Sequence, residues 1–363
     1  MNPKAALPKP APAPKPPGQA GFRMPAEWEP HDSTWIAWPH NRSDWPGKLQ
    51  AIPWVYADIV RHLSRVERVD ILVRDQAAEV RALRILQLSG AVMDSLRFHR
   101  WPTNRVWTRD YGPAFVTNGR SLGAVKWRFN AWAKYPDWKL DDDAGKKMAN
   151  HSAGETWQPE QLGRPLVLEG GSIDVNGAGT LITTEECLLS DIQGRNPGVS
   201  RETVEKAFSD YLGIRNVIWL GSGIVGDDTH GHVDDITRFV SPNTVVTTVE
   251  PDSTDPNHKP LQQNLELLRS AVTADGKPLN IVELPMPSPV IFRGQRLPAS
   301  YANFYVANGL VLIPTFNDSK DRRALAILAE CFPGREVVGI HSRDLVWGLG
   351  TLHCMTQQQP RIV

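Results

Sequence analysis

Four turns of one kind, spaced at nearly equal intervals, constrain the fold of this chain more than any other feature of its sequence. Each turn holds Asn-Gly or Pro-Asn between two short runs rich in β-forming residues, a pattern typical of a β-hairpin. Successive turn asparagines are 58, 67 and 65 residues apart: Asn118, Asn176, Asn243 and Asn308. A period of this length indicates a repeated structural unit in a ring or array.

The repeated unit predicted from this pattern is strand, turn, strand, helix, strand. The expected hairpins pair residues 114–117 with 122–129, 172–175 with 180–184, 236–240 with 245–249, and 301–306 with 310–314. Polar segments with helical spacing follow at 143–150, 200–212, 257–272 and 320–332, and further strands at 216–220, 279–284 and 336–340. Ser200 is a favourable N-cap for the second of these helices.

The N-terminal part fits a fifth unit that lacks its opening strand. It contains an expected strand at 34–38, a helix at 54–63 and a strand at 69–73, and the run 352–358 can supply the missing strand. We therefore predict an α/β ring of five units, in which the two ends of the chain pair and leave no free sheet edge.

The domain organisation that follows is simple. Residues 1–20 are mostly Ala, Pro and Lys, and we expect a disordered tail there. Residues 21–363 form one predicted domain.

Composition argues against several classes of binding partner and of metal or disulfide site. Lys plus Arg and Asp plus Glu both number 40, so zero net charge gives no reason to expect nucleic acid or an anionic membrane as a partner. No apolar run reaches transmembrane length. The three cysteines, with no CxxC pair, argue against a disulfide framework or a thiolate zinc site. We expect a cytoplasmic protein in a reducing compartment.

Unusual polar residues precede the first hairpin strand of successive units. If the units form a ring, these equivalent positions converge on its axis and bring together Asp110, Glu169, His232, Asp234 and Cys354. Most of these residues are flanked by Gly or Pro, and glycine permits close approach to a ligand. The competing interpretation of the cysteine is an inert, buried apolar residue.

A thiol, an imidazole and several carboxylates predict a particular chemistry. The thiol can act as a nucleophile and the imidazole as a general acid and base. Acyl transfer needs at most one carboxylate, whereas surplus carboxylates favour a planar, cationic guanidinium substrate. Carboxylates beside a thiol oppose its ionisation, so a bound guanidinium would help to ionise its own attacker.

Other interpretations of the same residues stay open at this point. Asp110 could form a loop ion pair with Arg109, and Glu169 could face solvent at a turn. The run 141–143 of three aspartates is typical of a solvated helix start. His230, His232 and Asp234 alternate along the chain and could chelate a metal, although no other His cluster supports that hypothesis.

Six motifs in this order resemble the agmatine deiminase family, which includes bacterial peptidylarginine deiminase-like proteins. They are Met-Pro-Ala-Glu-Trp-Glu-Pro-His at 24–31, Trp-Ile-Ala-Trp-Pro-His-Asn at 35–41, Thr-Arg-Asp-Tyr-Gly-Pro at 108–113, Leu-Glu-Gly-Gly-Ser at 168–172, Gly-His-Val-Asp at 231–234 and His-Cys-Met-Thr-Gln-Gln-Gln-Pro at 353–360. The resemblance implies a pentein fold, a five-bladed αβ propeller with pseudo-fivefold symmetry. It also implies hydrolysis of agmatine to N-carbamoylputrescine and ammonia, a step of putrescine biosynthesis, without metal or other cofactor.

The same resemblance assigns roles to individual residues. Cys354 corresponds to the nucleophile that forms an amidino-thioether, and His232 to the general acid and base. Asp110 and Asp234 correspond to the carboxylates that hold the guanidinium group. Glu169 corresponds to the acid that orients the imidazole.

An aromatic wall and two departures from the family pattern concern the substrate. Trp107 stands where the family has an aromatic residue beside the substrate. Residues 130–139 lack the glycine-rich run expected after Asn-Ala-Trp, and Asp235 replaces an expected Asn. Both departures put the tail of the substrate in question, since loops at the mouth of a pocket contact that end.

Three hypotheses for function therefore remain. A small cationic guanidine, agmatine, is the leading substrate, and peptidyl or free arginine is the nearest alternative. A non-catalytic pentein ring that only binds a ligand is the alternative from a different class. The sequence leaves open whether the protein forms a homodimer.

Overall fold

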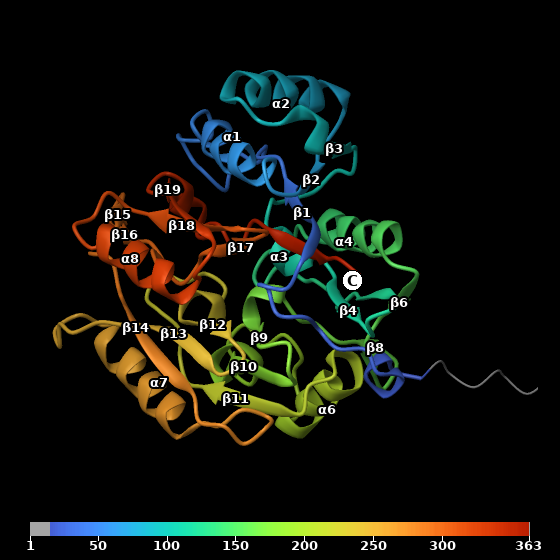
Figure 1. The fold of residues 1–363 in the computed structure, drawn as a ribbon, viewed down its shortest axis with the longest axis vertical. Coiled ribbons are helices and arrows are strands. Elements are labelled where there is room, and N and C mark those ends of the chain that lie inside the picture. The colour runs from blue at the N-terminus through green and yellow to red at the C-terminus, as the bar shows by residue number, and fades with distance from the viewer. Residues whose placement is uncertain (1–14, 363) are drawn as a thin grey trace, which may run out of the picture.

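The computed structural model describes residues 15–362, in which five β-sheets of three or four strands follow one another around the centre of the molecule (Figure 1). Four sheets share one plan: an antiparallel hairpin is extended by a third strand parallel to its second. Their strands are β4 Ala114–Thr117, β5 Leu122–Val125, β6 Glu155–Trp157; β9 Asp174–Val175, β10 Thr180–Thr184, β11 Asn216–Leu220; β12 Thr237–Ser241, β13 Thr244–Val249, β14 Asn280–Pro285; and β17 Tyr305–Ala307, β18 Leu310–Thr315, β19 Glu336–His341. The predicted α/β class and hairpin repeat are confirmed.

A helix connects the second and third strands of each of these sheets, and α7 and α8 lie on the rim of the molecule (Figure 1). The helices are α4 Lys139–Ser152, α6 Arg201–Leu212, α7 His258–Ser270 and α8 Asp321–Cys331, with the one-turn α5 Glu185–Leu188 before α6. The Ser200 side chain accepts a hydrogen bond from the backbone N–H of Thr203, as an N-cap does. This confirms the predicted start of α6.

The first of these helices corrects an expectation about the acidic run 141–143. Asp141 is fully buried and accepts a hydrogen bond from the backbone N–H of Arg105 at 3.1 Å, while Asp142 pairs with Lys126 at 3.0 Å. Only Asp143 is solvated. The run therefore anchors a loop and a lysine instead of forming a solvated helix start.

The fifth sheet closes the ring, as predicted. Strand β20, Gln357–Pro360, pairs antiparallel with β1, His31–Ala37, and places Gln357 opposite Trp35. Strands β2, Arg68–Leu72, and β3, Leu96–His99, continue the sheet in parallel. The connecting helices are α1 Ile52–Leu63 and α2 Gln76–Ser89.

Two details of this unit differ from prediction. The expected closing strand 352–358 begins only at Gln357, because residues before it fold into a turn in which Thr356 N–H donates to the His353 carbonyl at 3.2 Å. Helix α2 and strand β3 were not predicted. The helix buries only Ala78, Ala82 and Leu86, which is too narrow an apolar stripe to read from the sequence.

Short helical turns occupy the inner ends of four of the five units, and these turns position the candidate site. They are α3 Thr108–Tyr111, η3 Gly170–Ser172, η4 Val233–Asp235 and η5 Leu345–Gly348. The remaining elements are η2 Met93–Ser95 and the short hairpins β7 Glu160–Gln161 with β8 Arg164–Pro165, and β15 Ile291–Phe292 with β16 Gln295–Arg296.

Part of the segment 1–20, predicted to be a disordered tail, has regular structure. Residues 1–14 lie outside the described residues, but Pro17–Ala20 form the 3₁₀ turn η1, in which Pro17 is buried. Gly18 packs against the end of α6, where an added Cβ would lie 2.3 Å from the Ser209 carbonyl oxygen. None of the helices between residues 15 and 362 combines the length and the apolar character needed to cross a bilayer.

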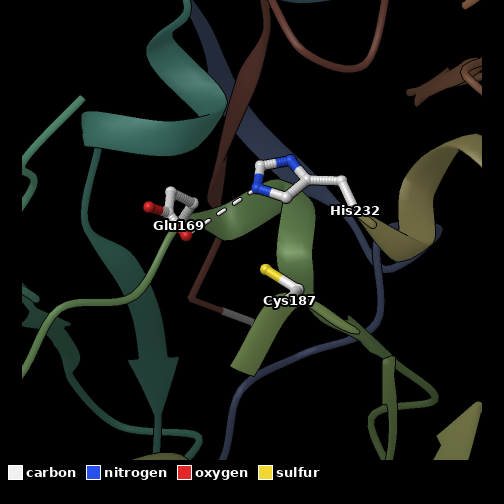
Figure 2. A group of neighbouring side chains, drawn as sticks. All are labelled: Glu169, Cys187 and His232. Atoms are coloured by element: carbon white, nitrogen blue, oxygen red, sulfur yellow. Dashed lines mark ion pairs between the residues drawn. The ribbon is translucent and has the colours of Figure 1, made fainter. Parts of the chain in front are cut away.

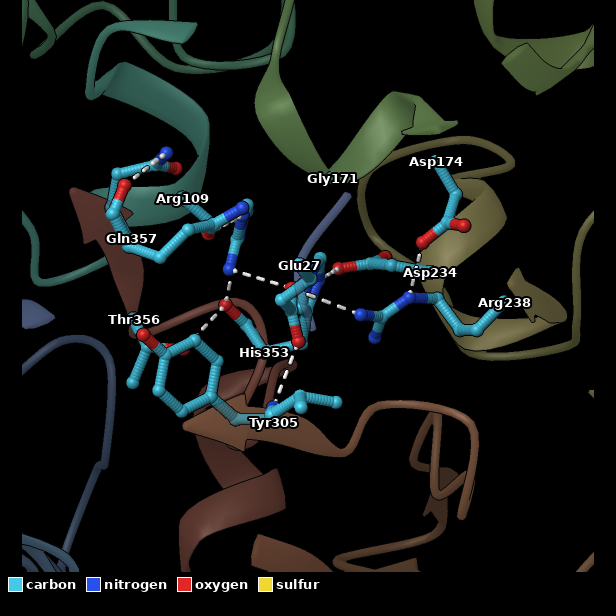
Figure 3. A network of polar contacts seen from close by, with 12 residues as sticks. Glu27, Arg109, Gly171, Asp174, Asp234, Arg238, Tyr305, His353, Thr356 and Gln357 are labelled. Atoms are coloured by element: carbon cyan, nitrogen blue, oxygen red, sulfur yellow. Dashed lines mark hydrogen bonds and ion pairs between the residues drawn. The ribbon is translucent and has the colours of Figure 1, made fainter. Parts of the chain in front are cut away.

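The centre of the ring is polar, whereas apolar residues fill the space between each sheet and its helix. Buried charged residues from four units meet there and are joined by hydrogen bonds and ion pairs (Figure 3). Buried charges are costly unless they are paired. The buried charges at the centre of the ring therefore indicate a functional site.

Candidate active site

The five predicted catalytic residues lie at the inner ends of four units. Asp110 lies on α3, Glu169 precedes η3, His232 and Asp234 lie at η4, and Cys354 follows η5. All five are at most 5% exposed. This burial rules out the interpretation of Glu169 as a solvent-facing turn residue.

Gly171 is the point at which three of these side chains meet. A Cβ atom on Gly171 would lie 2.6 Å from His232 Nδ1, 2.9 Å from Asp110 Oδ1 and 3.0 Å from Asp234 Oδ2. Any larger residue would push the imidazole and carboxylates apart. The second glycine of the Leu-Glu-Gly-Gly-Ser motif is therefore required at this position, because a side chain there would collide with the site residues.

The Cys354 sulfur has two polar neighbours. Asn303 Nδ2 donates a hydrogen bond to Sγ at 3.1 Å, and the thiol donates to Asp234 Oδ2 at 3.7 Å. Burial, followed by the charges of Asp234, Asp235 and Asp110, raises the pKa of the Cys354 thiol well above its ordinary value. When no cationic substrate is bound, the Cys354 thiol is therefore neutral at neutral pH.

Asn303 holds the cysteine loop in place. Its Oδ1 accepts hydrogen bonds from Thr351 Oγ1 at 2.7 Å and from the His353 backbone N–H at 3.1 Å, and its Nδ2 also donates to Asp235 at 3.0 Å. Asp235, where the family pattern suggested Asn, has a pKa well above its ordinary value because of burial and the adjacent charge of Asp234. Asp235 therefore ionises less readily than an ordinary aspartate.

His232 lies between two carboxylates. Its Nδ1 is 3.8 Å from Asp110 Oδ1, and its Nε2 is 3.7 Å from Glu169 Oε2. Burial disfavours the charged imidazole, but the charge of Asp110 and contacts with Cys187 and Glu169 outweigh it, so the pKa of His232 is well above its ordinary value. The resting site therefore contains an imidazolium at His232 and a neutral thiol at Cys354.

Glu169 stays ionised because it has a second partner. Arg195 donates from Nε to Glu169 Oε1 at 3.1 Å, and both side chains are fully buried. Burial opposes ionisation, but Arg195 and His232 lower the pKa of Glu169 to about 2. Glu169 is therefore a charged carboxylate 3.7 Å from the imidazole, and its role in orienting that ring stays a prediction.

The two other carboxylates differ in their hydrogen bonding. Asp110 accepts from Trp132 Nε1 at 3.0 Å and from the Gly171 backbone N–H at 3.1 Å. Burial raises the pKa of Asp110 to about 7, with Asp234 adding to the effect and His232 opposing it. Asp234 Oδ1 is buried and has no hydrogen-bond partner among the described residues. A buried carboxylate oxygen of this kind is ready to accept from a ligand.

Sequence reasoning missed the network that holds Asp234 (Figure 3). The two ring nitrogens of His353 contact two carboxylates, with Nδ1 2.7 Å from Asp234 Oδ2 and Nε2 2.8 Å from Glu27 Oε2. Glu27 also pairs with Arg109 at 3.2 Å and Arg238 at 3.0 Å. Arg109 therefore pairs with Glu27, and the alternative of a loop ion pair with Asp110 is wrong.

A cavity of about 430 Å³ opens onto the sulfur and is lined by Trp107, Asp110, Trp132 and Cys354. Trp107 was predicted to form a wall, and it does line the cavity. Trp132 was not assigned a role, although it lies in the Asn-Ala-Trp segment. Ala131, Trp132 and Ala133 all have left-handed φ angles, between 52° and 59°. Backbone strain of this kind is retained where the surroundings impose it.

The metal ligands considered from the sequence are not gathered. His230 faces Ser190 and Glu186, at 3.3 and 3.8 Å, away from His232. Among residues 15–362, the donor group close enough for a metal is instead Glu169, Cys187 and His232, whose ligand atoms lie within 4.8 Å of one another (Figure 2). The guanidinium of Arg195 on Glu169 places a positive charge beside these donors, which disfavours a cation there.

Comparisons with known proteins agree with this geometry. Residues 23–360 match the model of the Porphyromonas-type peptidyl-arginine deiminase family. The chain belongs to this family. It is 36% identical over 377 residues to an agmatine deiminase of Medicago truncatula, an alignment that covers 94% of this chain and 97% of that one.

Solved structures of family members have the same fold. The agmatine deiminase of Enterococcus faecalis superposes with a TM-score of 0.88 at 31% identity, over 96% of this chain and 99% of that one. An agmatine deiminase of C. jejuni gives a TM-score of 0.81 at 28% identity, over 94% and 96% of the two chains. The deiminase resemblance seen in the sequence motifs therefore extends to the whole described fold.

Proposed function

We propose that this deiminase-family protein hydrolyses agmatine to N-carbamoylputrescine and ammonia through a covalent adduct on Cys354. The observation that carries the proposal is the Cys354 thiol in a cavity with Asp110, 3.7 Å from Asp234 Oδ2, while His232 lies 3.8 Å from the same Asp110. The agmatine deiminases that cover almost the whole chain support the choice of substrate. No metal or other cofactor is required by this mechanism.

Substrate binding uses the two carboxylates that face Gly171. The guanidinium group donates to Asp110 and to the unpartnered Oδ1 of Asp234, as planar guanidinium groups do with carboxylates. Its positive charge offsets the anions that raise the pKa of Cys354. The thiol proton passes along its existing hydrogen bond to Asp234 Oδ2, and the thiolate forms.

Ammonia leaves in the first half of the reaction. The sulfur attacks the guanidinium carbon, an S–C bond forms, and the C=N electron pair moves to nitrogen to give a tetrahedral adduct. Protonated His232 transfers its proton to one terminal nitrogen. The C–N bond breaks, and ammonia departs from a positively charged amidino-thioether.

Water completes the reaction. Neutral His232 accepts a proton from water while the oxygen attacks the amidino carbon. The S–C bond then breaks, the hydroxyl proton passes to sulfur, and the ureido product leaves. The ammonia that departed in the first half took the proton held by Asp234 and left as ammonium, so the free enzyme now returns to its initial state.

Peptidyl or free arginine is the alternative substrate, and the match to the Porphyromonas-type peptidyl-arginine deiminase family favours the peptidyl form of this alternative. A ring that only binds its ligand gives no reason for a thiol, an imidazolium and three carboxylates to share one buried site. Measuring ureido product and ammonia from equal concentrations of agmatine, arginine and a blocked arginine peptide separates the candidates. We expect agmatine to give the highest kcat/KM and Cys354→Ser to give no ammonia, and activity confined to an arginine substrate would refute the proposal.

The proposal also covers the domain organisation, the location and the oligomeric state of the protein. We infer that residues 21–363 act as one catalytic domain in the cytoplasm, where a reducing environment keeps Cys354 reduced. A homodimer is the oligomeric state that we propose, and light scattering of the purified protein tests it. A monomer mass would refute the dimer and leave the chemistry unaffected.

A further inference from the structure

The cavity that reaches Cys354 contains an acidic side chain that the proposed chemistry does not use. Asp44 lines this cavity, and its side chain is only 6% exposed. Its Oδ2 atom is buried and has no hydrogen-bond partner within residues 15–362. Because native structures satisfy nearly all buried polar atoms, an unpartnered carboxylate oxygen at a cavity wall points to a ligand with a donor group.

The charged residue nearest to Asp44 is already committed elsewhere. Arg105 Nε lies 3.7 Å from Asp44 Oδ1, which is longer than a hydrogen bond. The same guanidinium group donates from Nη1 to the carboxylate of Asp137 at 2.9 Å and to its carbonyl at 3.2 Å. Asp44 therefore shares a cation with another acid and retains capacity for a second one.

Asp228 also lines the cavity, but both oxygens of its carboxylate already have partners. It pairs with the ammonium of Lys134 and accepts a hydrogen bond from the hydroxyl of Tyr135 at 2.7 Å. Lys134 and Tyr135 lie in the segment that lacks the glycine-rich run of the family pattern. A cationic substrate group would have to displace Lys134 from Asp228, whereas it would find Asp44 without a hydrogen-bond partner on Oδ2.

Packing fixes the position of Asp44 relative to the sulfur. The indole of the adjacent Trp45 is fully buried, donates to the Leu345 carbonyl at 2.8 Å and packs against Trp107 at a tilt of 48°, with ring centroids 5.7 Å apart. Gly350 packs closely against both Trp107 and Cys354. A Cβ atom added to Gly350 would lie 2.9 Å from the Trp107 side chain and 3.1 Å from the Cys354 side chain. Asp44 is thus held by one continuous set of contacts that reaches the cysteine loop.

We propose that Asp44 is the specificity-determining residue that binds the distal ammonium group of the substrate. The substrate class is then an alkyl guanidine that carries a second cationic amine. Free arginine places an α-carboxylate at that end of the molecule, and a like charge beside Asp44 is unfavourable. This inference rests on the proposed guanidine hydrolysis at Cys354 and names how that site selects its substrate.

The test compares two substrates that differ only in the distal group, agmatine and butylguanidine. Their kcat/KM ratio is measured for the wild type, for Asp44→Asn and for the control Asp228→Asn. We expect the ratio to fall about 10- to 100-fold in Asp44→Asn, the effect of one hydrogen bond between charged groups. We expect it to stay within about threefold in Asp228→Asn. Asp44→Ser provides a second variant if Asp44→Asn does not fold.

The outcomes separate this inference from the function on which it rests. If the wild type hydrolyses neither guanidine, the proposed function fails. If it hydrolyses agmatine and the Asp44 variants keep the wild-type ratio, the function stands and the inference is wrong. If the ratio falls only in Asp228→Asn, the amine binds Asp228 and the inference is also wrong.

Discussion

Glu27 is the residue whose replacement tests the polar centre of the ring most sharply. Its carboxylate accepts from the Val306 backbone N–H at 2.8 Å and contacts Arg109, Arg238 and His353 at 3.2, 3.0 and 2.8 Å. The two arginines are at most 3% exposed. Glu27→Gln keeps the size of the side chain but removes its negative charge. It also replaces one acceptor oxygen with an NH2 group, which cannot accept from these donors.

The magnitude follows from the burial of the partners. Removing one partner of a buried ion pair costs about 3–5 kcal/mol, because the remaining charges are left buried without compensation. An unfolding entropy of about 2.1 cal/mol/K per residue gives about 0.76 kcal/mol/K for 363 residues. We therefore expect Glu27→Gln to lower Tm by about 4–7 °C.

Glu29→Gln is the matched control. Glu29 also pairs with an arginine, Arg23, at 2.6 Å, but the two side chains are 29% and 43% exposed. An exposed pair contributes about 0.2–1 kcal/mol, so its loss lowers Tm by about 1 °C or less. Calorimetry of both variants measures the difference, and equal Tm values for them would refute the central role of Glu27.

The pH dependence of this stabilisation has a definite sign. Burial opposes the charged form of Glu27, but Arg238, His353 and Arg109 hold its pKa well below the ordinary value of 4.5. A group with a lowered folded pKa stabilises the protein fully above its unfolded pKa and loses that effect as the pH falls through the folded pKa. The Tm difference between wild type and Glu27→Gln should therefore be constant from pH 6 to 8 and shrink progressively as the pH falls below about 4.5.

Two further predictions concern the site. Gly171→Ala should lower kcat/KM about 100-fold by displacing His232 and the carboxylates, while Gly154→Ala, where an added Cβ has no atom within 4 Å, should leave it unchanged; equal activity of the two variants would contradict the packing at Gly171. Because the pKa of Asp110 is raised to about 7 and only its ionised form pairs with a guanidinium, KM for agmatine should rise as the pH falls below about 7. A KM that is flat from pH 6 to 8 would contradict this assignment.

The sequence predicted the repeated units because their signals are local. Each hairpin is defined by a turn asparagine between β-rich runs, and Ser200 caps its helix from the adjacent position. The closure of the ring was also predictable, since one unit lacked a strand and the chain end could supply it. The catalytic candidates stood out because Asp110, His232 and Cys354 lie in short motifs at equivalent places in the repeat.

The rest of the site depends on contacts between distant segments. Glu27 and His353 are 326 residues apart in the chain, and both occur in the recognised motifs, yet nothing local indicates that they pair. Cys187 reaches His232 from α5, and no spacing rule marks it. Asp141 resembled a solvated helix start because its burial is imposed by a neighbouring loop. Long-range packing, which the sequence does not display, decides each of these cases.

The formation of a covalent adduct on Cys354 is the central claim, and mass spectrometry of enzyme quenched with acid during agmatine turnover tests it most directly. The account predicts a species heavier than the free enzyme by the mass of agmatine minus ammonia, located on the peptide that contains Cys354 and absent from Cys354→Ser. Ammonia release at the normal rate with no such species at any time point, or an adduct on Cys187 or Cys331 instead, would contradict it.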